Sequence, residues 1–368
     1  MVVGGGVAGV EAAFALHELA ADHTEVTLLS PDADFLYRPL AVREPFTKLA
    51  PLQFPLAEIL ADAGAHFVPD AFRWLDVAHR TVHTRGGREL GYAALLLALG
   101  ARTKPLFKHA QTIDAGRVSA HLRGLLEEVQ DGSLRRLVAL VPSRAGWPLP
   151  MYELVLLLCS GARGRGVELE LTIVTAEDGP LGAFGTPASD AVSSLLETEG
   201  IRVVTSPKFG VPAPGLVAVP GGLELEADRI IALPQCYGPS TPGVPKRARA
   251  GFIATDPYCR VRGMRGVYAA GDITDFPLKF GAVAGMQADT AARSIARLAG
   301  AEVELVPFTP VIDGALLGGT RPLYLSAHLI GGHCHRSTVS DVAPPRLESK
   351  LAASCLGPYL DARAPAAS

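Results

Sequence analysis

The sequence lacks an excess of basic residues. Lys and Arg total 34 against 37 Asp and Glu, which gives a net charge of −3 at pH 7. A general nucleic-acid binder needs surplus cations to neutralise phosphates, so this balance excludes that class. With 48% hydrophobic and 19% charged residues, the 368-residue chain is too apolar to be disordered. At roughly 150 residues per domain, we expect two or three domains.

Long hydrophobic runs and paired cysteines are also missing. No apolar run approaches the ~18 residues that span a bilayer, and the longest, 92–98 and 154–159, have the length of a strand or a buried helix. The five cysteines are odd in number and scattered, with no CxxC pair. A disulfide scaffold and a tetrahedral zinc cage are therefore excluded, and the pattern fits a reducing, cytoplasmic compartment.

The first residues carry a glycine pattern that is typical of dinucleotide binding. Gly4, Gly6 and Gly9 form G-x-G-x-x-G after a short apolar strand, and residues 7–22 follow with helical periodicity. A second β-type run at 25–29 completes a β-α-β unit. In such a unit the glycines let the backbone approach a pyrophosphate, and the helix N-terminus holds its charge. Because a strand usually has ~5–6 residues, we expect the chain to extend upstream of its first residue.

The acidic residue that usually ends the second strand of this unit, roughly 20 residues past the glycines, is absent. The strand ends at Ser30, and Asp32 follows closely. The Ser30 hydroxyl can still exchange one hydrogen bond with an adenosine ribose. We therefore count Ser30 among the cofactor-binding candidates, at a less tightly specified adenosine end.

A second stretch far down the chain ends a β-type run in Gly271-Asp272, and a loop and a helix at 281–298 follow it. Together with the glycine motif and the strand that ends in Gly100, this order resembles the two-dinucleotide-domain flavoproteins, the pyridine nucleotide–disulfide oxidoreductases. The resemblance spans about residues 1–300. It implies an α/β fold with two Rossmann-like, doubly wound domains and a bound FAD.

The resemblance also implies a division of the chain. An FAD-binding domain would comprise residues 1–112 and 237–302, with an NAD(P)-binding-like domain inserted at 113–236. Residues 303–368 would form a small C-terminal α+β region. The FAD-binding domain is therefore expected to be discontinuous in sequence.

Several residues take cofactor roles through the same resemblance. The Asp272 carboxylate would bind the ribityl chain, since a carboxylate accepts two charge-assisted hydrogen bonds from a diol. The helix N-terminus at Gly281 and Ala282 would face the flavin pyrimidine, where its partial positive charge favours the reduced anion. Arg38 lies in a segment similar to one in type II NADH dehydrogenases and sulfide:quinone oxidoreductases. It would neutralise the pyrophosphate, and a solvated loop arginine is the alternative.

Glycines are scarce where the second domain needs them. If Glu153 matches Glu11 of the first motif, the three glycine positions fall at Gly146, Pro148 and Met151. Pro148 removes a backbone N–H that would face a phosphate, and Met151 adds bulk. We interpret this domain as nucleotide-binding in fold and impaired for NAD in chemistry.

Redox cysteines are missing beside the predicted flavin. Residues 35–50, where disulfide reductases carry a Cys pair, contain none. The impaired second domain resembles the sulfide:quinone and flavocytochrome sulfide dehydrogenase branch. The cysteines of that branch are nevertheless absent from 142–150 and 308–314. Cys159 is best explained as a core thiol, so we do not expect sulfide oxidation through a cysteine persulfide.

Two polar residues are the catalytic candidates. Lys279 would stabilise negative charge on the reduced ring, and a surface side chain covering Phe280 is the alternative. Gln287 resembles the glutamine that faces the quinone pocket in type II NADH dehydrogenases. Trp147 would shield the ring face or fill the gap left by the lost nucleotide.

The C-terminal region predicts short strands at 323–325 and 338–339 and a helix at 346–360. Adjacent ligands in His333-Cys334-His335 would point to opposite faces of a strand, so we expect no metal site. The helix has a thin basic face, which favours a core-facing or dimer contact over membrane docking.

Three functions compete. The leading one is an FAD-dependent oxidoreductase that passes electrons through its flavin to a quinone-like or other small acceptor, with NADH disfavoured as the donor. The alternatives are an NAD(P)H-dependent flavoprotein reductase and a non-catalytic flavin-binding module. The expected partners are a small-molecule donor and acceptor and no nucleic acid. A homodimer and peripheral contact with the inner face of the membrane stay open.

Overall fold

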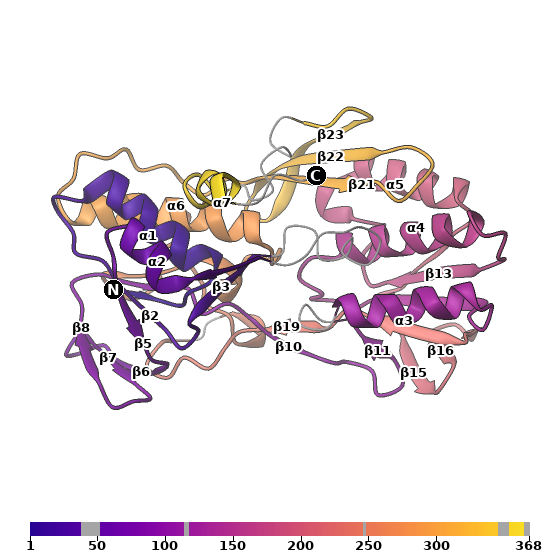
Figure 1. Cartoon of the computed structure of the whole chain (residues 1–368), viewed down its shortest axis with the longest axis horizontal. Helices are drawn as coiled ribbons and strands as arrows, with labels where there is room; N and C mark the ends of the chain where they lie inside the picture. Colours follow the sequence, from indigo (N-terminus) through magenta and orange to yellow (C-terminus); the bar gives the residue numbers. More distant parts are fainter. Residues whose placement is uncertain (38–51, 114–117, 246–247, 345–352, 364–368) are drawn as a thin grey trace.

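Two parallel sheets lie side by side in the computed structural model, each with its own helices, and a C-terminal sheet lies over the second (Figure 1). The structure describes residues 1–37, 52–113, 118–245, 248–344 and 353–363. Among these residues no helix combines the length and hydropathy needed to cross a bilayer.

The first sheet has five parallel strands in the order β20-β9-β1-β2-β5, and its strands are nearly continuous apolar runs, as expected of a sheet covered on both faces. They are β1 (Val2–Val3), β2 (Thr27–Ser30), β5 (His66–Pro69), β9 (Leu95–Leu97) and β20 (Val267–Ala269). β20 pairs with β9 although about 170 residues separate them in sequence. The domain predicted to bind FAD is therefore assembled from two distant parts of the chain.

Helices α1 (Val7–Ala20) and α6 (Gly281–Leu298) pack together against this sheet. Their contact is rich in buried alanines, among them Ala12 and Ala288, so the two helices approach closely. The predicted helix at 281–298 matches α6 at both ends. This packing places the N-termini of both helices at the same edge of the sheet (Figure 1).

The second sheet is also parallel, in the order β11-β18-β12-β13-β14. Its strands are β11 (Gln111–Thr112), β12 (Arg136–Val141), β13 (Glu170–Thr175), β14 (Arg202–Thr205) and β18 (Arg229–Ala232). Its helices are α3 (Val118–Gln130), α4 (Leu149–Arg163) and α5 (Thr186–Thr198). A small antiparallel sheet adjoins it, formed by β15 (Gly210–Ala213), β16 (Leu216–Val219) and β17 (Leu223–Glu226).

Antiparallel pairs complete the first half and join it to the second. β10 (Arg102–Lys104) pairs with β19 (Gln235–Tyr237) where the chain passes between the two sheets. The predicted hairpin region at 82–92 forms β7 and β8 of a three-stranded sheet. The remaining elements are β3 (Asp34–Tyr37), β4 (Leu52–Pro55), α2 (Leu56–Asp62), β6 (Phe72–Asp76), β7 (Thr81–Thr84) and β8 (Glu89–Gly91).

The C-terminal region is larger in strand content than the sequence predicts. It forms an antiparallel sheet of β21 (Val311–Leu316), β22 (Leu323–Ile330) and β23 (His333–Ser340). Gly331 and Gly332 have φ of 59° and 86°, which allows the tight turn between the last two strands. Sequence analysis missed β21 because Gly314 and Asp313 weaken its alternating pattern.

The C-terminal sheet and helix bind to different halves of the molecule. Ile312 and Leu325 belong to the core of the second half. Leu356 and Leu360 of α7 (Leu356–Arg363) are buried with Val10 against the first half. This fits the core-facing helix that the sequence favours, and the rest of the predicted helix at 346–360 falls partly outside the described residues. The domain boundaries themselves remain predictions.

Candidate functional site

Two of the three motif glycines, Gly4 and Gly9, lie where a side chain would clash with backbone, and the third, Gly6, leaves its helix end uncovered. Gly4 has φ +120°, and a Cβ there would lie 2.2 Å from the Ala98 carbonyl oxygen. A Cβ on Gly9 would lie 1.8 Å from the Gly4 carbonyl oxygen. Gly6 is the exposed N-cap of α1, with open space at its Cβ position and no side-chain cap. The turn therefore presents bare backbone at a helix N-terminus, as an anion site requires.

The second stretch meets the first at the same edge of the sheet. Gly271 has φ +79°, and a Cβ there would lie 3.1 Å from Ala8 Cβ and 3.4 Å from Ala284 Cβ. Gly271 is thus wedged between the first turns of α1 and α6. A single 3₁₀ turn, η4 (Gly271–Ile273), then carries Asp272 into the space beside the glycine turn.

The charges of Asp272 and Lys279 act on each other in this space, although no salt bridge joins the two described side chains. The buried Oδ1 of Asp272 has no hydrogen-bond partner among the described residues. Burial raises the Asp272 pKa, and the Lys279 charge opposes that rise. The Lys279 Nζ donates to the Thr274 carbonyl oxygen at 2.5 Å and lies 4.1 Å from the Phe252 ring centroid. Burial lowers the Lys279 pKa to about 8, against the opposing effect of the Asp272 charge.

These residues fit an FAD. A buried carboxylate oxygen without a partner is costly unless a ligand supplies a donor, and the ribityl hydroxyls are such donors. The N-terminus of α6, at Gly281 and Ala282, carries no side-chain cap and faces the same space. Gly6 leaves room for a pyrophosphate at the N-terminus of α1.

Three further cofactor candidates differ in their surroundings. Ser30 is 1% exposed, and its Oγ accepts the Asp32 N–H at 3.3 Å, so the hydroxyl is held inside the turn. Gly100, with φ +67°, follows β9 and has open space at its Cβ position. Arg38 lies outside the described residues.

Gln287 is buried and hydrogen-bonded within the fold. The side chain is 1% exposed, and its Oε1 accepts the Gly271 N–H at 2.8 Å. Its Nε2 donates to Thr274 Oγ1 at 3.2 Å. Both polar atoms are engaged inside the fold, and the quinone-facing role that the resemblance implies for Gln287 stays a prediction.

The loop before α4 differs from the glycine turn in length as well as composition. Residues 142–148, seven in all, join β12 to α4, whereas residues 4–6, three in all, join β1 to α1. Pro148 is the N-cap of α4 just as Gly6 is of α1, which agrees with the register set by Glu153. Pro150 adds a second residue without an N–H to the first turn. An anion at this helix would meet few donors.

The longer loop lies against the first half of the molecule. The Gly146 carbonyl oxygen accepts the Lys279 backbone N–H at 3.2 Å. Trp147 stacks on Phe280, the N-cap of α6, with ring centroids 4.0 Å apart. The geometry thus supports Trp147 as a cover over the predicted flavin side.

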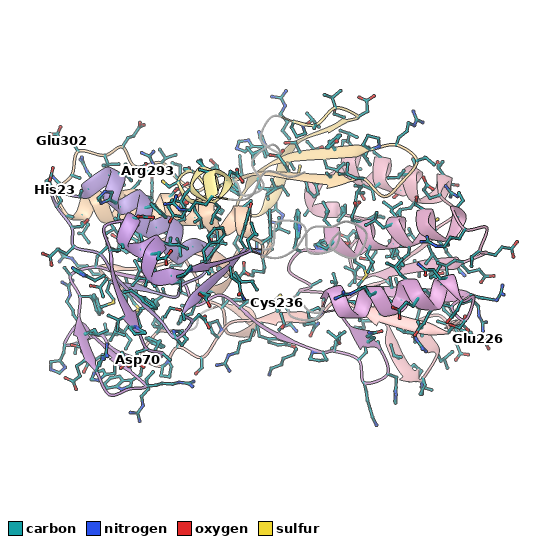
Figure 2. The ribbon with its side chains drawn as sticks, in the orientation of Figure 1. His23, Asp70, Glu226, Cys236, Arg293 and Glu302 are labelled. Carbon is teal, nitrogen blue, oxygen red and sulfur yellow. The ribbon has the colours of Figure 1, made fainter. Side chains whose placement is uncertain are left out.

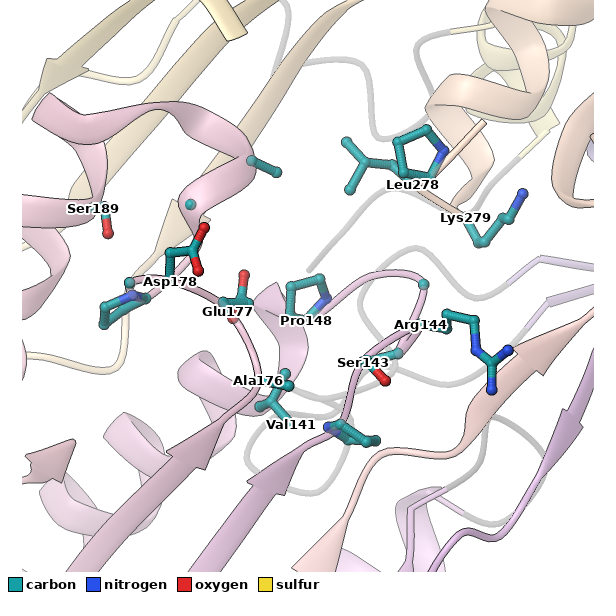
Figure 3. Close-up of a pocket in the computed structure, with 18 of the residues that line it drawn as sticks. Val141, Ser143, Arg144, Pro148, Ala176, Glu177, Asp178, Ser189, Leu278 and Lys279 are labelled. Carbon is teal, nitrogen blue, oxygen red and sulfur yellow. The ribbon is translucent and has the colours of Figure 1, made fainter. Parts of the chain in front are cut away.

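A cavity of about 1230 Å³ lies at the carboxyl edge of the second sheet, beside this loop (Figure 3). It extends from Asp178 and Ser189 to Arg144 and Lys279. Glu177, which follows β13, is half-buried there, and its Oε2 accepts the Tyr152 hydroxyl at 2.7 Å. The Thr175 hydroxyl donates to the same oxygen at 3.0 Å. Glu177 therefore stabilises the loop instead of offering a free carboxylate to a ribose.

Cys236 is a residue of the site that sequence reasoning missed. It lies on β19 between the two halves of the molecule (Figure 2). A Cβ added to Gly146 would lie 2.9 Å from its Sγ and 3.1 Å from Lys279 Cβ. Burial and the Asp272 charge raise the Cys236 pKa, so it is a poor nucleophile. No spacing in the sequence connects it with Lys279, and only the strand pairing brings them together.

The comparisons with known proteins agree with this fold. The family model for pyridine nucleotide-disulphide oxidoreductases matches residues 156–295. An NADH dehydrogenase-like protein of Mycobacterium tuberculosis is 26% identical over 293 residues, which cover 74% of this chain and 72% of that protein. A sulfide-quinone reductase of Aquifex aeolicus is 26% identical over 207 residues, 54% of this chain and 47% of that protein.

Solved structures show the same architecture. The sulfide:quinone oxidoreductase of Aquifex aeolicus superposes with a TM-score of 0.79 at 19% identity, covering 92% of this chain and 86% of that one. A NAD-dependent persulfide reductase of A. fulgidus gives a TM-score of 0.62 at 18% identity, over 89% and 63% of the two chains. The fold is that of the two-domain flavoprotein oxidoreductases. The chain is an FAD-dependent oxidoreductase that resembles the pyridine nucleotide-disulphide oxidoreductases.

Proposed function

We propose that this enzyme takes electrons from a small donor other than NADH and passes them through bound FAD to a quinone-like acceptor. The observation that carries the proposal is the contrast between the two helix N-termini. The α1 turn offers bare glycine backbone, whereas the first turn of α4 begins with Pro148 and contains Pro150. Only the first is built to hold a pyrophosphate.

On the FAD side, the chain binds and orients the cofactor. Gly4, Gly6 and Gly9 form the pyrophosphate turn, and the Asp272 carboxylate accepts the ribityl hydroxyls. FAD, when bound, supplies the two-electron chemistry. Lys279 carries a positive charge beside the FAD site, and this charge favours the negatively charged reduced form of the flavin.

On the donor side, the loop 142–148 contacts the first half of the molecule and is not arranged to bind a nucleotide. It lies against Lys279 through Gly146 and against Phe280 through Trp147. Two contributions therefore oppose NADH: fewer N–H donors, and a Glu177 carboxylate already bonded to Tyr152. Met151 is buried in the core of the second half and does not line the cavity.

A quinone-like acceptor is supported by the relatives, one of which is named a sulfide-quinone reductase. Residues 142–150 and 308–314, where that branch carries its cysteines, contain none in this sequence, so we do not propose sulfide as the donor. The proposal includes a cytoplasmic enzyme that meets its acceptor peripherally, at the inner face of the membrane. Because α7 packs its leucines on the first half of the molecule, it does not supply that contact. The homodimer remains a prediction.

The donor side is tested by oxygen-free titration of the holoenzyme. We expect dithionite to bleach the flavin absorbance and micromolar NADH to leave it unchanged over the same minutes. A Pro148→Gly/Pro150→Ala double variant restores two backbone N–H groups. It should speed NADH reduction by at least about tenfold, because a hydrogen bond to a charged group is worth ~1.5–3 kcal/mol.

The matched control is Pro142→Ala, which changes a proline of the same loop outside the helical turn and should leave the NADH rate unchanged. Rapid bleaching of the unaltered enzyme by micromolar NADH would refute the donor part of the proposal. It would favour an NAD(P)H-dependent reductase, the second candidate. That candidate rests on the cavity of about 1230 Å³, which lies where open α/β sheets bind nucleotides.

A further inference from the structure

A buried hydrogen-bonded turn contains Asp272 and accepts a hydrogen bond from Lys279. Gln287 is 1% exposed and Thr274 is 0% exposed. The Thr274 hydroxyl donates to the Gly271 carbonyl oxygen at 2.9 Å and accepts from Gln287 Nε2 at 3.2 Å. With the bond from Gly271 N–H to Gln287 Oε1, one amide side chain closes the whole turn onto α6.

The backbone of this turn needs an outside acceptor. Gly271 follows β20, has φ +79° and begins a 3₁₀ turn. Its N–H has no acceptor within that turn and donates to Gln287 Oε1. A buried N–H without an acceptor costs about 1–3 kcal/mol. Gln287 therefore fixes where the residue after Gly271, the Asp272 of the site, is held.

The same turn also holds the lysine. The Thr274 carbonyl oxygen accepts the Lys279 ammonium, while the Thr274 side chain is bonded to Gln287. Lys279 is thus connected to α6 through a single residue, and its backbone N–H is bonded to Gly146. The position of the ammonium relative to Asp272 follows from the geometry of Thr274.

We propose that Gln287 is a positioning residue which, through Thr274, holds the Lys279 ammonium beside Asp272 and thereby sets the reduction potential of bound FAD. The inference rests on the role proposed above for Lys279, and it is distinct from the quinone contact expected for Gln287.

The physical reason is the sensitivity of a buried charge to its surroundings. Burial has already lowered the Lys279 pKa to about 8, and the ammonium is supported by the Thr274 oxygen and by the charges of Asp272, Cys236 and Asp275. A displacement that weakens the Thr274 bond or moves the ammonium away from Asp272 lowers the pKa further, because the remaining charges offset less of the lost solvation. At neutral pH the site then carries less positive charge, and the reduction potential of the flavin falls.

The test measures the midpoint potential of bound FAD from about pH 6 to about pH 10, a range that brackets the Lys279 pKa of about 8. The unaltered enzyme should show a change of slope near that pKa. Gln287→Met keeps the length of the side chain and removes both polar atoms. It should move the change of slope down by about one pH unit. Thr274→Val should do the same independently, and Lys279→Met should abolish it.

The matched control is Thr290→Val, farther along α6, whose hydroxyl donates to the Met286 carbonyl oxygen within the helix. It should leave the change of slope in place. If Gln287→Met and Thr274→Val lower thermal stability but keep the unaltered profile, Gln287 is structural only and the inference fails. If Lys279→Met itself keeps the change of slope, the proposed role of Lys279 fails instead, so the two failures are distinguishable.

Discussion

Three buried carboxylates differ in what they meet, and the difference marks the site. Glu11 on α1, which follows β1, and Glu153 on α4, which follows β12, occupy matching positions in the two halves. Glu11 accepts the N–H groups of Cys355 and Leu356, and Glu153 accepts those of Leu317 and Gly318 at its Oε2. Both are structural. Asp272 Oδ1 has no hydrogen-bond donor among the described residues, as is also true of Glu153 Oε1, but Asp272 is the one that follows Gly271 beside the glycine turn.

Replacing Asp272 should therefore affect the FAD-free and FAD-bound protein in opposite directions. Asp272→Asn removes a charge whose burial is costly, so the melting temperature of the FAD-free protein should rise. The same change removes charge-assisted hydrogen bonds to the ribityl chain and should weaken FAD binding by about tenfold or more. Calorimetry of the FAD-free protein and fluorescence titration with FAD measure the two effects.

The matched control is Asp275→Asn, an exposed acid three residues further along the chain. It should change neither quantity appreciably. Unchanged FAD affinity in Asp272→Asn would remove the main cofactor contact from the proposal.

At the scale of elements, the sequence predicts regular structure better than connections. The helix predicted at 281–298 matches α6 at both ends, since its periodicity is uninterrupted and a glycine marks its start. The loop 142–148 is four residues longer than its counterpart 4–6, and loop length leaves no trace in periodicity. The positions of Gln287 and Cys236 depend on long-range packing, which a local motif does not encode.

The docking of the C-terminal helix should make stability depend on pH. The Glu11 side chain of α1 faces α7, where it accepts the Leu356 N–H. Burial together with a hydrogen bond to Asp289 raises its pKa from 4.5 to about 8. The folded protein therefore binds a proton that the unfolded chain has already lost between these values. The contribution of Glu11 to the free energy of unfolding is fully present below about pH 4.5. It falls as pH rises toward about 8, by at most about 1.4 kcal/mol per pH unit for one proton.

Glu11→Gln should flatten this dependence, because a neutral amide cannot titrate while its oxygen still accepts the Leu356 N–H. Chemical unfolding at a series of pH values gives the slope. The matched control is Glu18→Gln, an exposed acid two turns further along α1. A slope as steep in Glu11→Gln as in the unaltered protein would assign the effect to other groups.

At the scale of the whole molecule, one loop joins the two halves beside the predicted flavin. The loop carbonyl oxygens of Arg144 and Gly146 accept the backbone N–H groups of Cys236 and Lys279, at 2.9 and 3.2 Å. The Trp147–Phe280 stack covers this junction. The segment that matches the glycine turn of the first half thus connects the two halves. We expect this connection to restrict the movement of one half against the other, and the buried Cys236 thiol to report on that restriction.

Trp147→Ala should loosen the junction and expose this thiol. An aromatic pair of this kind is worth about 0.5–1.5 kcal/mol beyond the area it buries, so alkylation of Cys236 should accelerate by about tenfold, as expected for ~1.4 kcal/mol of opening free energy. Peptide mass spectrometry separates Cys236 from the other four cysteines. Trp74→Ala is the matched control, because the other tryptophan stacks on His83 within the first half and does not contact the loop. An unchanged Cys236 rate in Trp147→Ala would show that the backbone hydrogen bonds alone close the junction, and Trp147 would then only fill the space that the nucleotide has left.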